Sequence, residues 1–270
     1  MLRRISQISF VTLAAVTITA FGIDATDTLR GSSSTLLGQV IGTTKERVCP
    51  KGMVEIPAVT SFRCVDQFEV STGEQCPVPT PGSIADTETN LRDRNCQPRS
   101  HADHLPWSNV TRAHAAQLCA RVDKRLPTAV EWYQFSLGTP DRAEDCNLHS
   151  GAVEPSDSRE ECVSEHGVHD TVGNVWEWVN DDVIDQQYQG RSLPAAGYVT
   201  QTDNAGVATD TGQEASTQHG EDYLWSEAKG FYGMMRGGFY GSREDGGVYA
   251  VHAATDPDFF GPAIGFRCVQ

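Results

Sequence analysis

The 270-residue sequence has no excess of basic residues, no Cys-x-x-Cys pair and no internal repeat. Its 21 Lys and Arg are outnumbered by 36 Asp and Glu, giving a formal net charge of −15. This balance argues against nucleic-acid backbones and anionic membranes as partners and is compatible with cation binding. Without a Cys-x-x-Cys pair, and with the cysteines scattered, a structural zinc cluster is disfavoured.

The composition is that of a globular protein. Hydrophobic residues make up 39% and charged residues 21% of the chain, which argues against disorder as the main state. The length suits one large domain once a targeting segment is set aside.

The first 25 residues are expected to form a signal peptide. Arg3 and Arg4 give a basic start, residues 8–21 are mostly apolar, and Ile23 to Ala25 resembles a cleavage site. The alternative is a membrane anchor, but the apolar run is shorter than the roughly 20 residues that a spanning helix needs. We therefore expect a mature chain without a membrane span, in an extracytoplasmic compartment, periplasmic or secreted.

The rest of the chain divides into two parts. Residues 26–47 are rich in Thr, Ser and Gly without an apolar period, and are expected to form a flexible leader. Residues 48–270 are expected to form one domain.

Cysteine usage fits an exported domain. An even number of cysteines in an exported chain predicts disulfides, here four, although the number alone leaves many pairings open. The eight are Cys49, Cys64, Cys76, Cys96, Cys119, Cys146, Cys162 and Cys268.

Local patterns predict short strands and two helices. Residues 53–56 and 62–70 have strand character, and Cys49 and Cys64 bracket this hairpin. Residues 73–106 carry five prolines and are expected to form an irregular loop that a Cys76–Cys96 bridge would close.

Two capped helices follow in the sequence. Thr111 is a plausible N-cap for a helix with an apolar stripe. Thr128 and Glu131 form a capping box, and Gly138 stops that second helix. Residues 182–228 are polar and are expected to be a surface excursion or a variable binding loop. Because strand character returns only near the end, the pattern indicates an α+β fold.

Four stretches follow one another in the chain: "NVTRAHAAQLCARVDKRLPTAVEW", "GVHDTVGNVWEWVND", "MRGGFYGSRE" and "IGFRCV". In their order and spacing they resemble the sulfatase-modifying-factor family, which includes the formylglycine-generating enzyme. The resemblance covers about residues 49 to 270 and implies a variant of the C-type-lectin architecture with much irregular structure. It also implies a disulfide from Cys119 to Cys268, which leaves Cys146 and Cys162 as a further pair.

The catalytic cysteines of the family are missing. The formylglycine-generating enzyme holds copper with two thiolates shortly after its RGGS motif, whereas "RGGFYGSREDGGVYAVHAA" contains no cysteine. Gly241 stands near the first expected position and Glu244 or Gly246 near the second. Soft sulfur ligands select copper(I), so copper is not expected and no catalytic residue is assigned. Glu244, Asp245 and His252 would make a harder ligand set.

Calcium is the cation that the resemblance implies. Carried onto this sequence, one site uses the side chains of Asp170 and Glu177 and the carbonyls of Gly173 and Val175. Calcium takes six to eight oxygen ligands, which such a turn largely supplies. The alternative is that the two acids only cap and solvate a turn.

A second family site maps less completely. It would use Asn147 and the Leu148 carbonyl, with Asp157, Glu160 or Glu161 available downstream. The pairs His101 with His104 and His166 with His169 could each touch a metal, although exposed loop histidines are commoner.

We therefore expect a non-catalytic, calcium-stabilised domain that binds a peptide, glycan or envelope protein. The residues expected to line its cleft are Trp107, Trp225, Phe239, Tyr240, Arg243 and His252. One alternative is an oxidoreductase of the formylglycine-generating type that modifies a protein cysteine with an altered metal site. Another is a structural part of a surface assembly.

Overall fold

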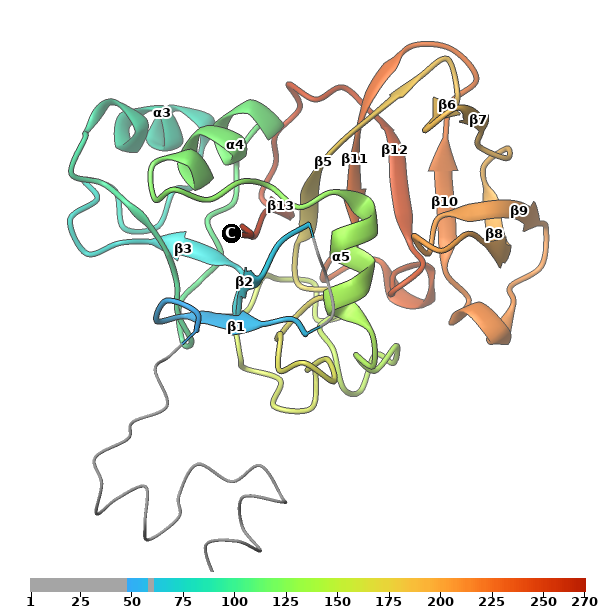
Figure 1. Cartoon of the computed structure of the whole chain (residues 1–270), viewed down its shortest axis with the longest axis horizontal. Helices are drawn as coiled ribbons and strands as arrows, with labels where there is room; N and C mark the ends of the chain where they lie inside the picture. The colour runs from blue at the N-terminus through green and yellow to red at the C-terminus, as the bar shows by residue number, and fades with distance from the viewer. Residues whose placement is uncertain (1–47, 58–60) are drawn as a thin grey trace, which may run out of the picture. The chain divides into compact units, whose positions relative to one another are not determined.

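The computed structural model describes residues 48–57 and 61–270 (Figure 1). Both the signal-peptide prediction (1–25) and the leader prediction (26–47) fall outside this part of the chain. Cys49 to Gln270 form one compact unit. Within the described ranges, no helix is long and apolar enough to cross a membrane.

Short elements separated by long irregular stretches make up the domain. The helices are α3 (Ile84–Arg92), α4 (Arg112–Ala120) and α5 (Ala129–Ser136), with 3-10 turns η1 (Thr217–His219) and η2 (Arg243–Asp245). The strands are β1 (Met53–Glu55), β2 (Cys64–Asp66), β3 (Val70–Thr72), β4 (Pro98–Ser100), β5 (Trp176–Ile184), β6 (Gln187–Tyr188), β7 (Arg191–Ser192), β8 (Gly197–Thr202), β9 (Ala208–Gly212), β10 (Tyr223–Ser226), β11 (Phe231–Arg236), β12 (Val251–Thr255) and β13 (Ile264–Gly265).

A nine-stranded mixed sheet organises the domain. Its order is β7-β6-β5-β11-β12-β10-β8-β9, and β13 pairs in parallel with β5. Strands β10 and β12 are also parallel, while β11 is antiparallel to both β5 and β12. Two separate antiparallel pairs, β1-β2 and β3-β4, complete the strands. The predicted α+β class is therefore correct.

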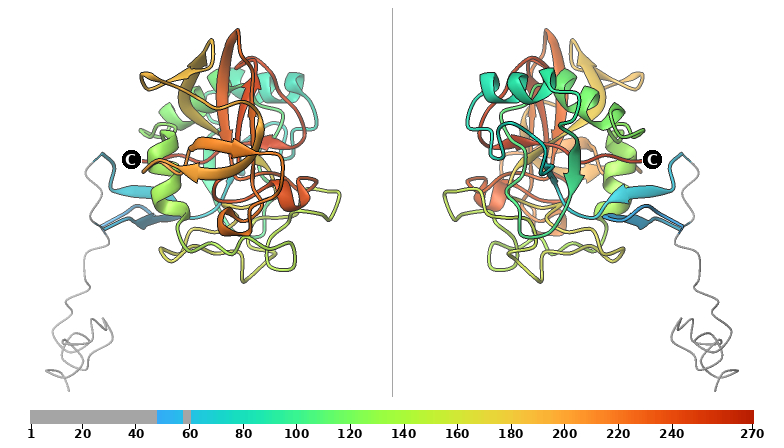
Figure 2. Two further views of the ribbon diagram at one scale, coloured as in Figure 1. Left: turned by 90° about the vertical axis from the view of Figure 1, so that its right-hand side faces the viewer. Right: turned by 90° about the vertical axis from the view of Figure 1, so that its left-hand side faces the viewer.

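Side-chain alternation gives the sheet two apolar faces. Val179 and Met234 belong to one buried cluster, which includes residues of α5, and Trp178 and Met235 belong to another, which includes residues of α4. In Figure 1, α3 and α4 lie on the side of β5 and β13, away from β8, β9 and β10. Figure 2 shows the same helices from the two sides.

Four disulfides use all eight cysteines of the chain. The bonds are Cys49–Cys64, Cys76–Cys96, Cys119–Cys268 and Cys146–Cys162. Each predicted pairing is present. The Cys119–Cys268 bond ties α4 to the chain end across 149 residues of sequence.

Both predicted helices begin where their caps indicate. The Thr111 hydroxyl accepts a hydrogen bond from the His114 N–H at the start of α4. At the start of α5, Thr128 and Glu131 form the reciprocal capping box. Gly138 follows this helix with a positive φ of 82°, a conformation that glycine adopts without strain.

Two sequence-based expectations are wrong. Residues 73–106 contain α3, which the polar sequence hides because its buried side chains, Thr87 and Asn90, are polar. Residues 182–228 are not a loop: they contribute β6 to β10, and the sheet continues through them. Most residues of this stretch are polar, so hydropathy does not reveal these strands.

Candidate functional site

The two stretches predicted to bind calcium lie side by side. The Asn174 N–H donates to the Asn147 carbonyl at 2.8 Å, and Asn147 Nδ2 donates to Asn174 Oδ1 at 3.1 Å. Gly173 has φ of 78°, and an added Cβ would collide with the Asn147 backbone. Glycine is therefore required where the loop 170–177 crosses residue 147.

Three carboxylates are buried beside this loop. Asp170 and Glu177 were expected from the sequence, and the structure adds Glu69, which lies between β2 and β3. Glu69 Oε2 accepts hydrogen bonds from Asn174 Nδ2 at 2.6 Å and from the Ser156 hydroxyl at 3.0 Å. Sequence inspection missed Glu69 because a single acid after a short strand carries no signal for burial.

Burial raises the pKa values of two of these acids, Glu69 and Asp170. The pKa of Glu69 lies well above its usual value because of burial, with the negative charges of Asp170 and Glu177 adding to the effect. Burial likewise raises the pKa of Asp170 to about 7. A bound cation would favour the ionised forms of both.

Glu177 is held by a buried arginine. Its two oxygens accept from Arg267 Nε at 2.8 and 2.9 Å, and Oε2 also accepts from Trp132 Nε1 at 2.7 Å. Glu177 is 1% exposed and Arg267 is fully buried. The side chain thus joins β5, α5 and the last segment of the chain, whatever else it binds.

A calcium ion would fit this loop through oxygens rather than through a cluster of acids. Glu69 Oε1 and Asn147 Oδ1 are buried without a hydrogen-bond partner, which is the condition that an oxygen-binding cation relieves. Among the described residues, no three His, Cys, Asp or Glu side chains are grouped to hold a metal ion. Main-chain carbonyls such as those of Gly173 and Val175 would have to complete the shell.

Apart from Asn147, whose Oδ1 has no hydrogen-bond partner, the residues of the second predicted calcium site are engaged elsewhere or exposed. The Leu148 carbonyl accepts from the Arg243 N–H at 2.8 Å. Asp157 Oδ1 lies 2.9 Å from His169 Nδ1, and Glu160 and Glu161 are exposed. This arrangement gives the second site less support than the first.

The histidines of the two pairs contact neighbouring groups of the chain. His101 and His104 are exposed with ring centroids 4.8 Å apart, and Nδ1 of each contacts the Ala102 carbonyl. His166 and His169 contact different acids, Glu165 and Asp157.

Five aromatic side chains form a continuous row on one face of the sheet. The ring-centroid distances are 5.2 Å for Tyr198–Tyr223, 4.9 Å for Tyr223–Trp225, 5.6 Å for Trp225–His252 and 5.7 Å for His252–Trp176. All are half-buried except Trp176, which is buried. We call these five residues the aromatic row.

Strand register explains the row. Tyr198 is paired with Tyr223, and Trp225 with His252, on neighbouring strands β8, β10 and β12. Burial lowers the pKa of His252 to about 4, so its ring is neutral near pH 7 and stacks on Trp225. The row is an uncharged aromatic surface.

The residues predicted to line one cleft lie in different surroundings. Trp225 and His252 lie in the aromatic row, and Phe239 and Tyr240 contact each other at 5.2 Å. Trp107 does not line a cleft: it is fully buried, and its Nε1 donates to the Thr87 hydroxyl. Its burial follows from α3, which the sequence did not reveal.

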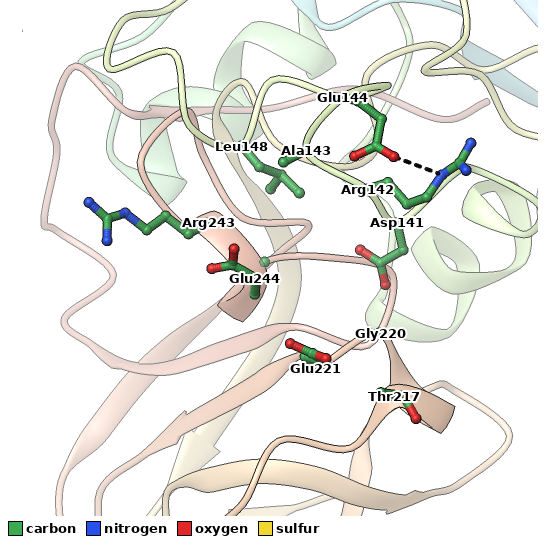
Figure 3. A pocket seen from close by; sticks show the side chains of 11 residues that line it. Asp141, Arg142, Ala143, Glu144, Leu148, Thr217, Gly220, Glu221, Arg243 and Glu244 are labelled. Atoms are coloured by element: carbon green, nitrogen blue, oxygen red, sulfur yellow. Dashed lines mark ion pairs between the residues drawn. The ribbon is translucent and has the colours of Figure 1, made fainter.

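Arg243 lies on the rim of a separate pocket of about 390 Å³ (Figure 3). Arg243, Glu244 and Gly246 form one wall of this pocket. They belong to the segment that contains η2, where the family's cysteines were expected. All eight cysteines are in disulfides. No thiolate is therefore present to bind copper(I).

The mixed sheet, the capped helices and the long irregular connections stapled by disulfides define a C-type-lectin-like α+β domain. The family described as "Sulfatase-modifying factor enzyme 1-like domain" matches residues 26–270. The chain belongs to this family. The fold and the family resemblance predicted from the sequence are thereby confirmed.

Solved structures of similar fold share little sequence. The "Major Tropism Determinant U1 Variant" superposes with a TM-score of 0.50 and 15% identity over 82% of this chain and 53% of that chain. This chain thus spans about half the length of that protein. PvdO from Pseudomonas aeruginosa gives a TM-score of 0.43 and 14% identity, covering 80% and 89% of the two chains. Comparison with curated proteins gives no match.

Proposed function

We propose that this protein is an exported, calcium-stabilised domain that acts by binding another protein through its aromatic row. The observation that carries the proposal is the row itself: an uncharged line of aromatic side chains along β8, β10 and β12, at the end of the sheet away from α3 and α4. Trp and Tyr dominate the binding energy of protein interfaces because they bury a large area at little cost in conformational entropy.

The cysteines support a binding role over the oxidation of a protein cysteine. Four disulfides occupy every cysteine, so the ligand type that the formylglycine-generating enzymes use for copper is missing. Four disulfides are also typical of extracytoplasmic proteins. Export by cleavage after Ala25 is part of the proposal, and N-terminal sequencing of the mature protein tests it.

The row supports a protein partner because it extends over three paired strands, β8, β10 and β12. Four of its five members are half-buried rather than enclosed. The likeness to the Major Tropism Determinant concerns the fold and names no partner for this chain.

Capture from extracytoplasmic extract with the immobilised protein tests the proposal. Trp225→Ala should lose a partner that the wild type retains, because it removes the central side chain of the row. Phe259→Ala is the matched control, since Phe259 is an exposed aromatic residue outside the row (52% exposed), and it should retain the partner.

Three results would count against the proposal. They are equal capture by Trp225→Ala and wild type, retention of an oligosaccharide instead of a protein, and stoichiometric copper(I) binding with free thiols in the purified protein. The last would favour an oxidase with rearranged disulfides.

A further inference from the structure

The pocket beside Arg243 has an acidic floor that neither the aromatic row nor the calcium loop explains. Its lining comes from the loop after α5, from η1 with the residues that follow it, and from η2. In Figure 3 the carboxylates of Asp141, Glu221 and Glu244 surround one space, while the Arg243 side chain extends away from it.

Two carboxyl groups meet at the floor of the pocket. Asp141 lines the pocket and Asp222 lies directly behind it, fully buried. An added Cβ on Gly247 would collide with Oδ1 of both acids, so these two oxygens are neighbours. Neither Oδ1 has a hydrogen-bond partner.

Within the part of the chain that the structure describes, no cationic side chain donates a hydrogen bond to either acid of this pair. Asp222 Oδ2 accepts from the Tyr249 N–H at 2.6 Å, which is a neutral donor. Arg236 is the nearest buried cation, but its guanidinium nitrogens donate to the carbonyls of Ala205, Gly206 and Val248. Arg142 lines the pocket and is ion-paired with Asp145, its neighbour in sequence.

We propose that this pocket binds an alkylammonium or guanidinium group, the side chain of a lysine or arginine. The acids supply charge at the floor, and Ala143 and Leu148 in the wall supply apolar surface for the methylene stem. Lysine and arginine bind in this way, with a buried stem and a paired head group.

The size and ligand set of the pocket favour an organic cation over a metal ion. A volume of about 390 Å³ is far larger than a bare ion needs and falls in the range of small-ligand sites. The described residues offer no group of three His, Cys, Asp or Glu for a metal.

The inference rests on the proposed binding function, because the cation would belong to the bound protein. Tyr198 lies in the aromatic row and close to Asp245, whose charge raises the pKa of that tyrosine. Since Asp245 belongs to η2, the pocket wall adjoins the row. A partner on the row could therefore place one basic side chain in the pocket.

Titration of the purified protein with Nα-acetyl-lysine methylamide, followed by NMR, tests the pocket without the partner. The protein stays in calcium throughout. We expect shifts confined to amides around the pocket, such as those of Gly220 and Gly246. The uncharged analogue Nα-acetyl-norleucine methylamide should cause none, and shifts of equal size with it would refute a cation site.

Asp141→Asn keeps the shape of the side chain and removes its charge. We expect it to weaken probe binding about ten-fold, as for the loss of a charge-assisted hydrogen bond. Glu74→Gln, on the segment between β3 and β4, changes the net charge equally and should have no effect. If Asp141→Asn does not fold, Glu244→Gln on the exposed rim should still weaken binding about three-fold by the loss of nearby charge.

The pH dependence of probe binding distinguishes a binding role of Asp141 from a purely structural one. Burial raises the pKa of Asp141 to about 7, and a cation binds the ionised form. Probe affinity should therefore rise from about pH 6 to about pH 8 in the wild type and stay flat in Asp141→Asn. A flat wild-type profile would overturn the inference.

Two outcomes separate this inference from the proposed function. If Trp225→Ala loses the partner while Asp141→Asn binds the probe normally, the pocket assignment is wrong and the function stands. If Mn²⁺ alone broadens the pocket amides and the lysine probe does not shift them, the site binds a metal ion and the inference is wrong.

Discussion

Replacing Glu177 by alanine tests the buried centre of the domain. The carboxylate accepts from Arg267 and from Trp132 Nε1, and none of the three side chains is more than 1% exposed. The substitution would leave a fully buried guanidinium without its counter-charge and an indole N–H without its acceptor.

The expected loss of stability is large. Breaking a buried ion pair by removing one partner costs about 3–5 kcal/mol, because the remaining charge is buried and uncompensated. The indole N–H without an acceptor adds about 1–3 kcal/mol. Domains are commonly stable by about 5–15 kcal/mol, so Glu177→Ala should be close to unfolding at room temperature.

Urea unfolding with and without a calcium chelator separates the ion pair from the proposed calcium. Wild type should lose stability in chelator, by about 2.7 kcal/mol if calcium is present at a hundred times its dissociation constant. Glu177→Ala should be destabilised in both conditions and should lose little more in chelator. A wild-type midpoint that the chelator does not change would refute the calcium site and leave the ion-pair argument intact.

The control for this experiment is Glu88→Ala. Glu88 pairs with Arg92 at 2.9 Å, but both side chains are exposed, 46% and 73%. An exposed i,i+4 pair contributes about 0.3–0.5 kcal/mol. If Glu177→Ala costs no more than Glu88→Ala, our account of the Arg267 pair is wrong.

Three further predictions concern stability measured by urea or thermal unfolding. Replacing Cys119 and Cys268 by serine should cost about 5 kcal/mol by loop entropy, since the bond spans 149 residues; a loss under about 1 kcal/mol would contradict this. Thr128→Ala should cost about 1 kcal/mol through the lost N-cap of α5, whereas Thr128→Ser should cost little. Burial raises the folded-state pKa of Asp222 well above 3.8. The contribution of this carboxyl to the free energy of unfolding is therefore full below about pH 4, and it declines as the pH rises through the range in which only the unfolded state is ionised. Asp222→Asn should therefore make unfolding stability less dependent on pH above about pH 4, and an unchanged profile would show that the carboxyl does not titrate there.

Features set by neighbours in the chain were predictable. Thr111 and Thr128 cap helices three residues away, so their patterns are visible in the sequence. The glycine at position 173 was also predictable, because it is part of the family motif. The structure gives the physical reason for it: any larger residue would collide with the Asn147 backbone.

Features that depend on the burial of polar groups could not be predicted from the sequence. Glu69 sits among other acids, and Trp107 became core because the polar helix α3 packs nearby. The polar strands β8 and β9 were taken for a loop, since their stability comes from sheet hydrogen bonds and one buried face rather than from hydropathy.

The sequence by itself determined the family, the α+β class, the starts of α4 and α5 and the lack of cysteines after the RGG motif, because each is a matter of residue identity or local spacing. Only the tertiary structure decided that Tyr198, Trp225 and His252 form one surface, and that Asp141 and Asp222 share one pocket floor. These contacts join residues far apart in the chain. They exist because strand register and burial bring the side chains together, and a linear pattern does not record that.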